Sequence, residues 1–95
     1  MPAYIIAEID ATDPVKMEEY RKRSPVAIAA HQGKFIARGG TVAPLEGGWT
    51  PSRIVLIEFP TLEHAKRFYA SPEYAHAKEA RKGAGTMRVI AVEGV

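Results

Sequence analysis

The order in which strand-like and helix-like segments follow one another most narrows the folds open to this chain. Four apolar segments rich in β-branched residues have the length of strands. They span residues 4–9, 34–38, 53–59 and 88–92. The third segment is apolar on both faces, which predicts a place in the middle of a sheet.

Helix signals separate the first two of these segments. A helix is predicted from Pro14, with the preceding Thr-Asp pair supplying a cap for the free amides of the first turn. Pro25 lies inside the helical stretch and lacks an amide donor, so a kink or break is expected near Ser24. Gly33 is predicted to end the helix.

Two more capping signals follow the third strand. Thr61 begins a second helix, and Ser71-Pro72-Glu73 begins a shorter one that runs to about Arg81. With this pair taken as one helical connection, the order is β-α-β-β-α-β. Two right-handed crossovers of this kind give a four-stranded antiparallel sheet with its helices on one face. The prediction is a single α+β domain of ferredoxin-like fold over residues 1–95.

Such a fold leaves the other face of the sheet uncovered. Strand alternation places five apolar residues on that face: Tyr4, Ile6, Ile36, Ile54 and Leu56. An apolar face of this size is not stable in water on a monomer, whereas a two-fold axis buries it against a second copy. We therefore expect a homodimer.

Charge and residue content argue against several classes of protein. Lys and Arg number 13 and Asp and Glu 11, and they are spread along the chain without the basic cluster of a nucleic-acid-binding protein. The chain has no cysteine, and its three histidines lack the spacing of metal ligands. We expect no metal and no tightly bound cofactor. The N-terminus lacks the basic start of a signal peptide and no segment is long enough to span a membrane, so a cytoplasmic location is expected.

A set of short motifs, distributed in order over nearly the whole chain, carries a family resemblance. They are Pro2-Ala3-Tyr4, Tyr20, Ala37-Arg38-Gly39-Gly40, Leu45-Glu46-Gly47 with Trp49, Arg53, Glu58-Phe59-Pro60, Ala65, Ser71-Pro72-Glu73-Tyr74, Arg81 and Glu93-Gly94. With them the chain resembles the domain-of-unknown-function family 1330, within the dimeric α/β-barrel superfamily. The resemblance implies the fold, the dimer and a pocket between sheet and helices. It implies no activity, although the superfamily includes cofactor-free monooxygenases, lactone isomerases and haem-dependent enzymes.

Three charged residues stand among the apolar residues of the strands. By alternation Arg38, Glu58 and Glu8 share the uncovered face, where a charge must be paired or line a wet cavity. Two interpretations stay open: structural ion pairs across the sheet or the dimer interface, or the lining of a polar pocket. In the second, Arg38 binds the oxygen atoms of an anionic or carbonyl-bearing ligand, and a carboxylate driven toward neutrality by burial acts as an acid or base.

The hairpin between the second and third strands sets the partners of these charges. A regular hairpin places Arg38 opposite Ile54. It also places Lys34 opposite Glu58. Arg38 then has no carboxylate directly across the sheet, and its partner comes from elsewhere: Glu8, Glu46, the second copy or a ligand.

Four further residues are candidates for a site. His31, near the end of the first helix, is stabilised by the helix dipole or transfers protons. Tyr74 forms a wall of the pocket or satisfies one buried partner, and Trp49 plugs the pocket or contacts the second copy. Arg81 clamps an anion or ends a solvated helix. The catalytic candidates are thus His31, Glu58 and Tyr74, and the ligand-binding candidates are Arg38, Glu8, Trp49 and Arg81.

No nucleophile elbow, phosphate-binding loop, dinucleotide fingerprint or metal motif is present. The leading hypothesis is a homodimer that binds a small organic molecule, anionic or carbonyl-bearing, between sheet and helices. One alternative is a cofactor-independent monooxygenase or isomerase acting on a small aromatic or lactone, favoured if His31 or Tyr74 faces a closed cavity beside Arg38. Another is a purely structural or interaction module, favoured if the sheet packs solidly without a cavity.

Overall fold

The structure, a computed structural model, describes all residues from Met1 to Val95. The strands are β1 (Ala3–Ala11), β2 (Lys34–Arg38), β3 (Ile54–Phe59) and β4 (Gly85–Glu93), and the helices are α1 (Pro14–Ala30), α2 (Leu62–Tyr69) and α3 (Pro72–Ala80). The strands form one antiparallel sheet in the order β2-β3-β1-β4, so β3 is central as predicted. The predicted ferredoxin-like fold is confirmed, with its second helical connection divided into α2 and α3.

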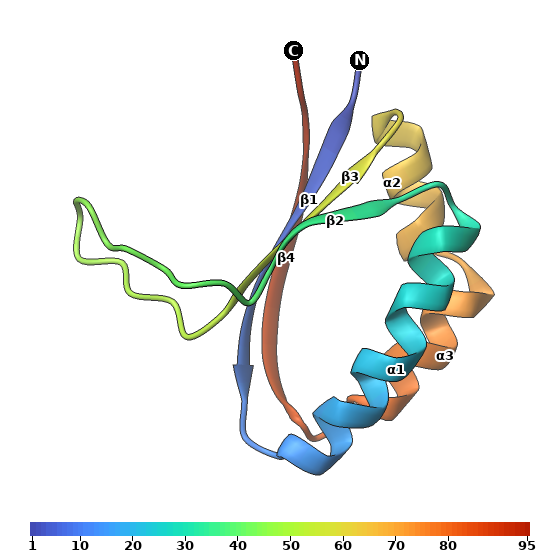
Figure 1. Ribbon diagram of the computed structural model, residues 1–95. Helices are drawn as coiled ribbons and strands as arrows, with labels where there is room; N and C mark the ends of the chain where they lie inside the picture. Colours follow the sequence, from blue (N-terminus) through green and yellow to red (C-terminus); the bar gives the residue numbers. More distant parts are fainter.

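All three helices cover the same face of the sheet, and the opposite face is bare (Figure 1). Alternation along the central strands turns Ile5, Val55 and Ile57 toward the helices, where they are buried. Phe68 of α2 packs on Phe59 of β3 with the ring centroids 5.1 Å apart. The hydrophobic core therefore lies between the two layers. None of the helices is both long and apolar enough to cross a bilayer.

Polar side chains begin the helices at the predicted positions. Asp13, rather than Thr12, caps α1 and accepts hydrogen bonds from two amides of its first turn. Thr61 caps α2 and Ser71 caps α3 in the same way. These caps satisfy amides that have no partner within the helix.

The C-terminal half of α1 departs from prediction in two respects. The helix continues through Pro25, so the expected break near Ser24 is absent; Ser24 is buried against the core, which holds both halves in line. The left-handed residue after the helix is Gln32, with φ 63°, and not Gly33. Glycine is needed at position 33 because a Cβ there would lie 2.7 Å from the ring of Phe59.

A β-bulge in β2 changes the face of its last residue. The pairing with β3 begins as predicted at Lys34, but the register shifts at Ile36, and Arg38 lies opposite Val55. Because Val55 is buried beneath the helices, Arg38 turns toward them as well. The prediction that Arg38 faces Ile54 and shares the uncovered face is wrong, since counting by alternation takes no account of an extra residue.

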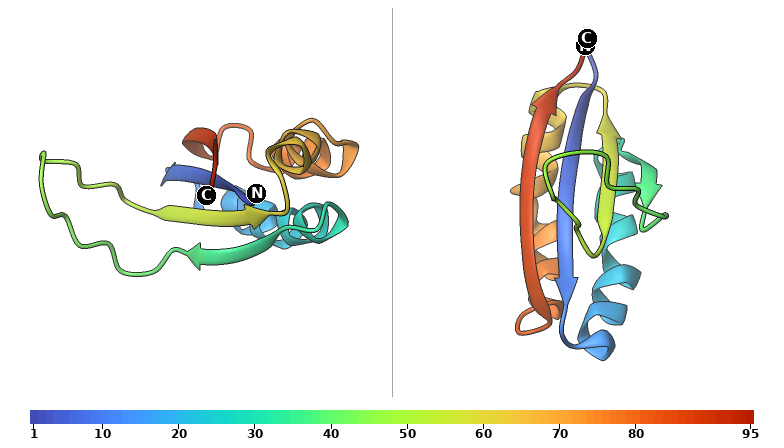
Figure 2. Two further views of the ribbon diagram at one scale, coloured as in Figure 1. Left: turned by 90° about the horizontal axis from the view of Figure 1, so that it is seen from above. Right: turned by 90° about the vertical axis from the view of Figure 1, so that its left-hand side faces the viewer.

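Residues 39–53, here called the arm, leave the sheet between β2 and β3. The arm extends from the bare face, away from the helices, and crosses in front of the sheet when that face is viewed directly (Figures 1 and 2). Gly47 and Gly48 turn the chain at its far end with φ of 85° and 71°. Its residues from Gly39 to Thr50 are all exposed.

Candidate binding site

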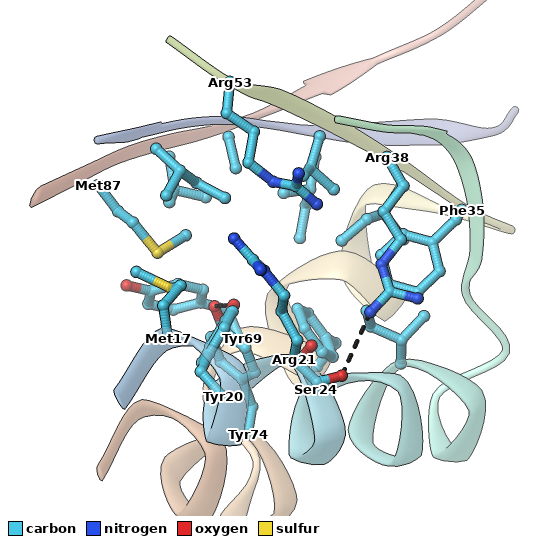
Figure 3. A pocket seen from close by; sticks show the side chains of 18 residues that line it. Met17, Tyr20, Arg21, Ser24, Phe35, Arg38, Arg53, Tyr69, Tyr74 and Met87 are labelled. Carbon is cyan, nitrogen blue, oxygen red and sulfur yellow. Dashed lines mark hydrogen bonds between the residues drawn. The ribbon is translucent and has the colours of Figure 1, made fainter. Parts of the chain in front are cut away.

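A cavity of about 40 Å³ lies between the sheet and the helices (Figure 3). Most of its wall is apolar, and its polar lining residues are Tyr20, Arg21, Ser24, Arg38, Arg53, Tyr69 and Tyr74. No aspartate, glutamate or histidine is among the lining residues. The cavity therefore offers positive charge and hydroxyl groups, but no carboxylate or imidazole that could act as a base.

Three arginines converge on this cavity. Arg53 reaches in from the end of the arm next to β3, Arg21 from α1 and Arg38 from β2 (Figure 3). Burial, and then the charges of Arg21 and Arg38, lower the pKa of Arg53. Arg21 contacts the carboxylate of Glu18 at 3.6 Å, while Arg38 and Arg53 form no ion pair. The mouth of the cavity thus carries an excess of positive charge.

Contacts with neutral groups hold Arg38 in this position. Its guanidinium carbon lies 4.4 Å from the centre of the Phe35 ring, a cation–π contact. Its Nη2 donates a hydrogen bond of 3.2 Å to the backbone carbonyl of Arg21. Phe35 and Arg38 can share a face only because the bulge at Ile36 lies between them.

Backbone features also set the position of Arg53. The amide of Ile9 donates to the carbonyl of Arg53 at 3.0 Å, which ties the residue to the end of β1. Gly39 has a φ of 72°, and a Cβ at this position would overlap the guanidinium of Arg53. The backbone conformation therefore favours glycine at position 39, and its missing side chain also leaves room for the guanidinium of Arg53 as it is placed here.

The helical side of the cavity contains a buried pair of tyrosines. The hydroxyl oxygens of Tyr20 and Tyr74 are 2.6 Å apart, and the rings meet edge to face at 70°. Burial, followed by the neighbouring Tyr74, raises the pKa of Tyr20, so this hydroxyl keeps its proton at neutral pH. One hydroxyl donates to the other, and the second proton remains for an acceptor in the cavity.

Of the candidates predicted from the sequence, Arg38 and Tyr74 line the cavity. His31 does not; it lies at the C-terminal end of α1, with Nε2 3.6 Å from the Glu73 carboxylate. Arg81 ends α3 behind the cavity wall, with its guanidinium carbon 5.5 Å from the centre of the Tyr20 ring. Neither His31 nor Arg81 is placed to touch a molecule in the cavity.

The remaining three candidates lie on the opposite face of the sheet. Glu58 forms an ion pair with Lys34 at 3.2 Å, and Glu8 forms one with Arg88 at 2.8 Å. For these two carboxylates the structure agrees with the interpretation as structural ion pairs. The Trp49 indole donates to Glu8 at 2.7 Å, so this side chain reaches from the arm to the bare face. Trp49 is therefore not a plug of this cavity.

Sequence reasoning did not assign Arg21 and Arg53 to a site. Arg21 borders the buried stripe of α1 that contains Tyr20 and Ser24, and a helical projection alone could have placed it at the edge of that stripe. For Arg53 the available signal was Gly39, which leaves room for a large neighbour. The direction of the Arg53 side chain depends on how the arm folds back, which no local pattern indicates.

The layered sheet and its cavity define a ferredoxin-like α+β protein. The resemblance carried by the motifs is confirmed: the chain belongs to the family described as a domain of unknown function, DUF1330, whose model matches residues 2–95. A search among curated proteins finds no match.

Several solved structures share the fold. RPA0582, a protein of unknown function from Rhodopseudomonas palustris, is 18% identical with a TM-score of 0.75, over 99% of this chain and 82% of that one. SnoaB, a cofactor-independent oxygenase from Streptomyces nogalater, is 14% identical with a TM-score of 0.66, over 99% of this chain and 93% of that one. A dimeric ferredoxin-like protein of unknown function from Thermobifida fusca is 15% identical with a TM-score of 0.66, over 99% of this chain and 92% of that one. At these identities the likeness concerns the fold alone.

Proposed function

We propose that the protein is a homodimer that binds a small organic anion in the cavity between its sheet and its helices. The observation that carries the proposal is the convergence of Arg21, Arg38 and Arg53 on one apolar cavity with a single weak carboxylate contact among them. Grouped like charges destabilise a fold unless something neutralises them. A bound carboxylate would do so, because a guanidinium donates two parallel hydrogen bonds to its oxygens.

The size of the cavity bears on how such a ligand enters. A volume of about 40 Å³ holds only a few water molecules, so an organic ligand must displace side chains. Long unbranched residues can yield in this way, and Met17 and Met87 lie across the cavity from Arg38 (Figure 3). The apolar wall suits the hydrocarbon body of the ligand, and the arginines suit its charged end.

The homodimer is supported by the bare face of the sheet. Ile90 is 63% exposed, Trp49 56% and Ile36 47%, a set of large apolar side chains in water on one chain. The chain exposes 5977 Å², compared with roughly 5,400 Å² for a typical monomer of its mass. A second copy seated on this face would cover these residues and the arm beside them.

Thermal melts with carboxylates test the binding proposal. Benzoate and hexanoate should raise the Tm of the wild type, by several degrees at ten times Kd, where binding adds about 1.4 kcal/mol. Arg38→Ala and Arg53→Ala should stay folded and lose this response. Arg67→Ala, an exposed arginine of α2 outside the cavity, should keep it.

Neutral analogues provide the second control. Benzamide and hexanamide have the same bodies without the charge and should raise the Tm of no variant. A large fall in the Tm of Arg38→Ala, together with no response to carboxylates in either protein, would assign Arg38 a structural role and contradict the proposal.

A second candidate function is a cofactor-independent monooxygenase or isomerase acting on a small aromatic or lactone. The observation that favours it is that Tyr74 lines the same cavity as Arg38. Since the lining includes no base, the substrate would react as an anion already held by the guanidiniums, with a tyrosine hydroxyl as hydrogen-bond donor. Oxygen uptake or isomer formation with ionisable phenols and lactones tests this function, and a Tyr74→Phe rate equal to that of the wild type would contradict the role of Tyr74.

A further inference from the structure

Pro25 occupies an unfavourable position inside α1. A proline in a helix interior removes one hydrogen bond and destabilises the helix. The bond lost is the one to the carbonyl four residues earlier, which belongs to Arg21. That carbonyl instead accepts the hydrogen bond from Arg38 Nη2, at 3.2 Å (Figure 3). The one backbone acceptor that the proline frees is thus the one that Arg38 uses.

We infer that Pro25 is a positioning residue of the anion site, which holds Arg38 at the cavity by leaving the Arg21 carbonyl without a helical donor. The inference rests on the proposed function. The carbonyl occupies one of the five N–H groups of the guanidinium and leaves the others for a ligand. The Phe35 ring, 4.4 Å away, restrains the same guanidinium through its face.

The chemistry of the acceptor explains why a proline serves this purpose. A carboxylate would also orient Arg38, but it would neutralise the charge that a ligand needs. A backbone carbonyl orients the guanidinium and leaves its full charge available. Arg53 likewise has no carboxylate partner, and Gly39 leaves room for its guanidinium.

A double-mutant cycle without ligand tests the contact itself. In the wild-type background Arg38→Ala should lower the Tm by several degrees, the effect of one hydrogen bond in a domain of this size. In the Pro25→Ala background it should lower the Tm less, because the amide of residue 25 then shares the Arg21 carbonyl and weakens its bond to Arg38. Pro25→Ala alone should raise the Tm. Additive effects of the two changes would overturn the inference.

Benzoate binding separates a positioning role from a merely structural one. Pro25→Ala should bind benzoate roughly 2- to 10-fold more weakly than the wild type although it is more stable, which corresponds to one hydrogen bond. Pro14→Ala, in the first turn of the same helix where the missing amide has no helical acceptor, should bind like the wild type.

Two results would count against the inference in different ways. If the wild type binds benzoate and Pro25→Ala binds it equally well, the positioning role is wrong and the proposed function stands. If the wild type binds no carboxylate, the anion site is wrong, and the role of Pro25 in it falls as well.

Discussion

Tyr20 and Tyr74 depend on each other for the hydrogen bond between their hydroxyl groups. Their oxygens are 2.6 Å apart in the core, and the side-chain hydroxyls have no other protein partner. Sequence reasoning expected Tyr74 to line the pocket or to satisfy one buried partner, and it did not identify Tyr20 as that partner. They stand 54 positions apart, so only the packing of α1 against α3 joins them.

Removing either hydroxyl should reveal this dependence. Tyr20→Phe or Tyr74→Phe leaves the other hydroxyl buried and unpaired, at a cost of about 1–3 kcal/mol. The double variant should lose less than the sum of the two single variants, because no unpaired group remains. Urea unfolding at neutral pH measures the three free energies, and Tyr69→Phe, at the more exposed edge of the cavity, is the control. Strictly additive losses would mean that the hydroxyls are not coupled.

The arm is attached to the sheet by a single side-chain hydrogen bond. The Trp49 indole donates to Glu8 at 2.7 Å, and Glu8 also accepts from Arg88 at 2.8 Å. The hydrogen bond from Arg88, and then that from Trp49, lowers the pKa of Glu8 from its usual 4.5. Trp49 is the one tryptophan of the chain, so its fluorescence reports on this contact.

Acid should therefore release the arm. A carboxyl whose pKa is lower in the folded protein contributes fully above its unfolded value of 4.5 and loses that contribution as the pH falls through the lower folded value. We expect the Trp49 emission to be constant near neutral pH and to shift to the red below pH 4.5. Glu8→Ala should show the shifted emission already at pH 7, and Glu63→Gln, at an exposed position of α2, should behave like the wild type. An emission in Glu8→Ala that equals the wild type at pH 7 would show that the arm does not rest on Glu8.

The bare face of the sheet is a feature of the whole molecule, because several strands form it together. Leu56 lies at the centre of this face on β3, with Ile6 as its neighbour on β1 and Ala37 on β2. In one chain Leu56 is only partly buried, so the face has room for a partner. Across a two-fold axis it would be fully buried.

Leu56→Asp should convert the proposed dimer into a folded monomer. A charge buried at the centre of an interface costs several kcal/mol, whereas a partly exposed site on the monomer tolerates it far better. Light scattering after gel filtration gives the mass of each species. Val26→Asp places the same charge on an apolar residue that is 67% exposed on α1 and should leave the dimer intact. A wild type that already scatters as a monomer at micromolar concentration would contradict the homodimer.

Much of the fold could be read from local patterns in the sequence. Alternation along the strands identified the bare face through Tyr4 and Ile6, and capping residues such as Thr61 located the helix starts. Both signals act between residues a few positions apart, so their outcome depends little on the rest of the chain. The pairing of Lys34 with Glu58 followed from the same local geometry.

The cavity, by contrast, was decided by contacts between distant segments. The register shift at Ile36 exists only against β3, and it moved Arg38 from the bare face to the cavity. Arg53 joins it because the arm returns beside Gly39. Alternation placed Glu8 on the bare face, but its partner there, Arg88, is 80 positions away. Local periodicity determines which residues a strand or helix can bury, but which charges meet depends on register and packing across the chain, and these are fixed only when the layers come together.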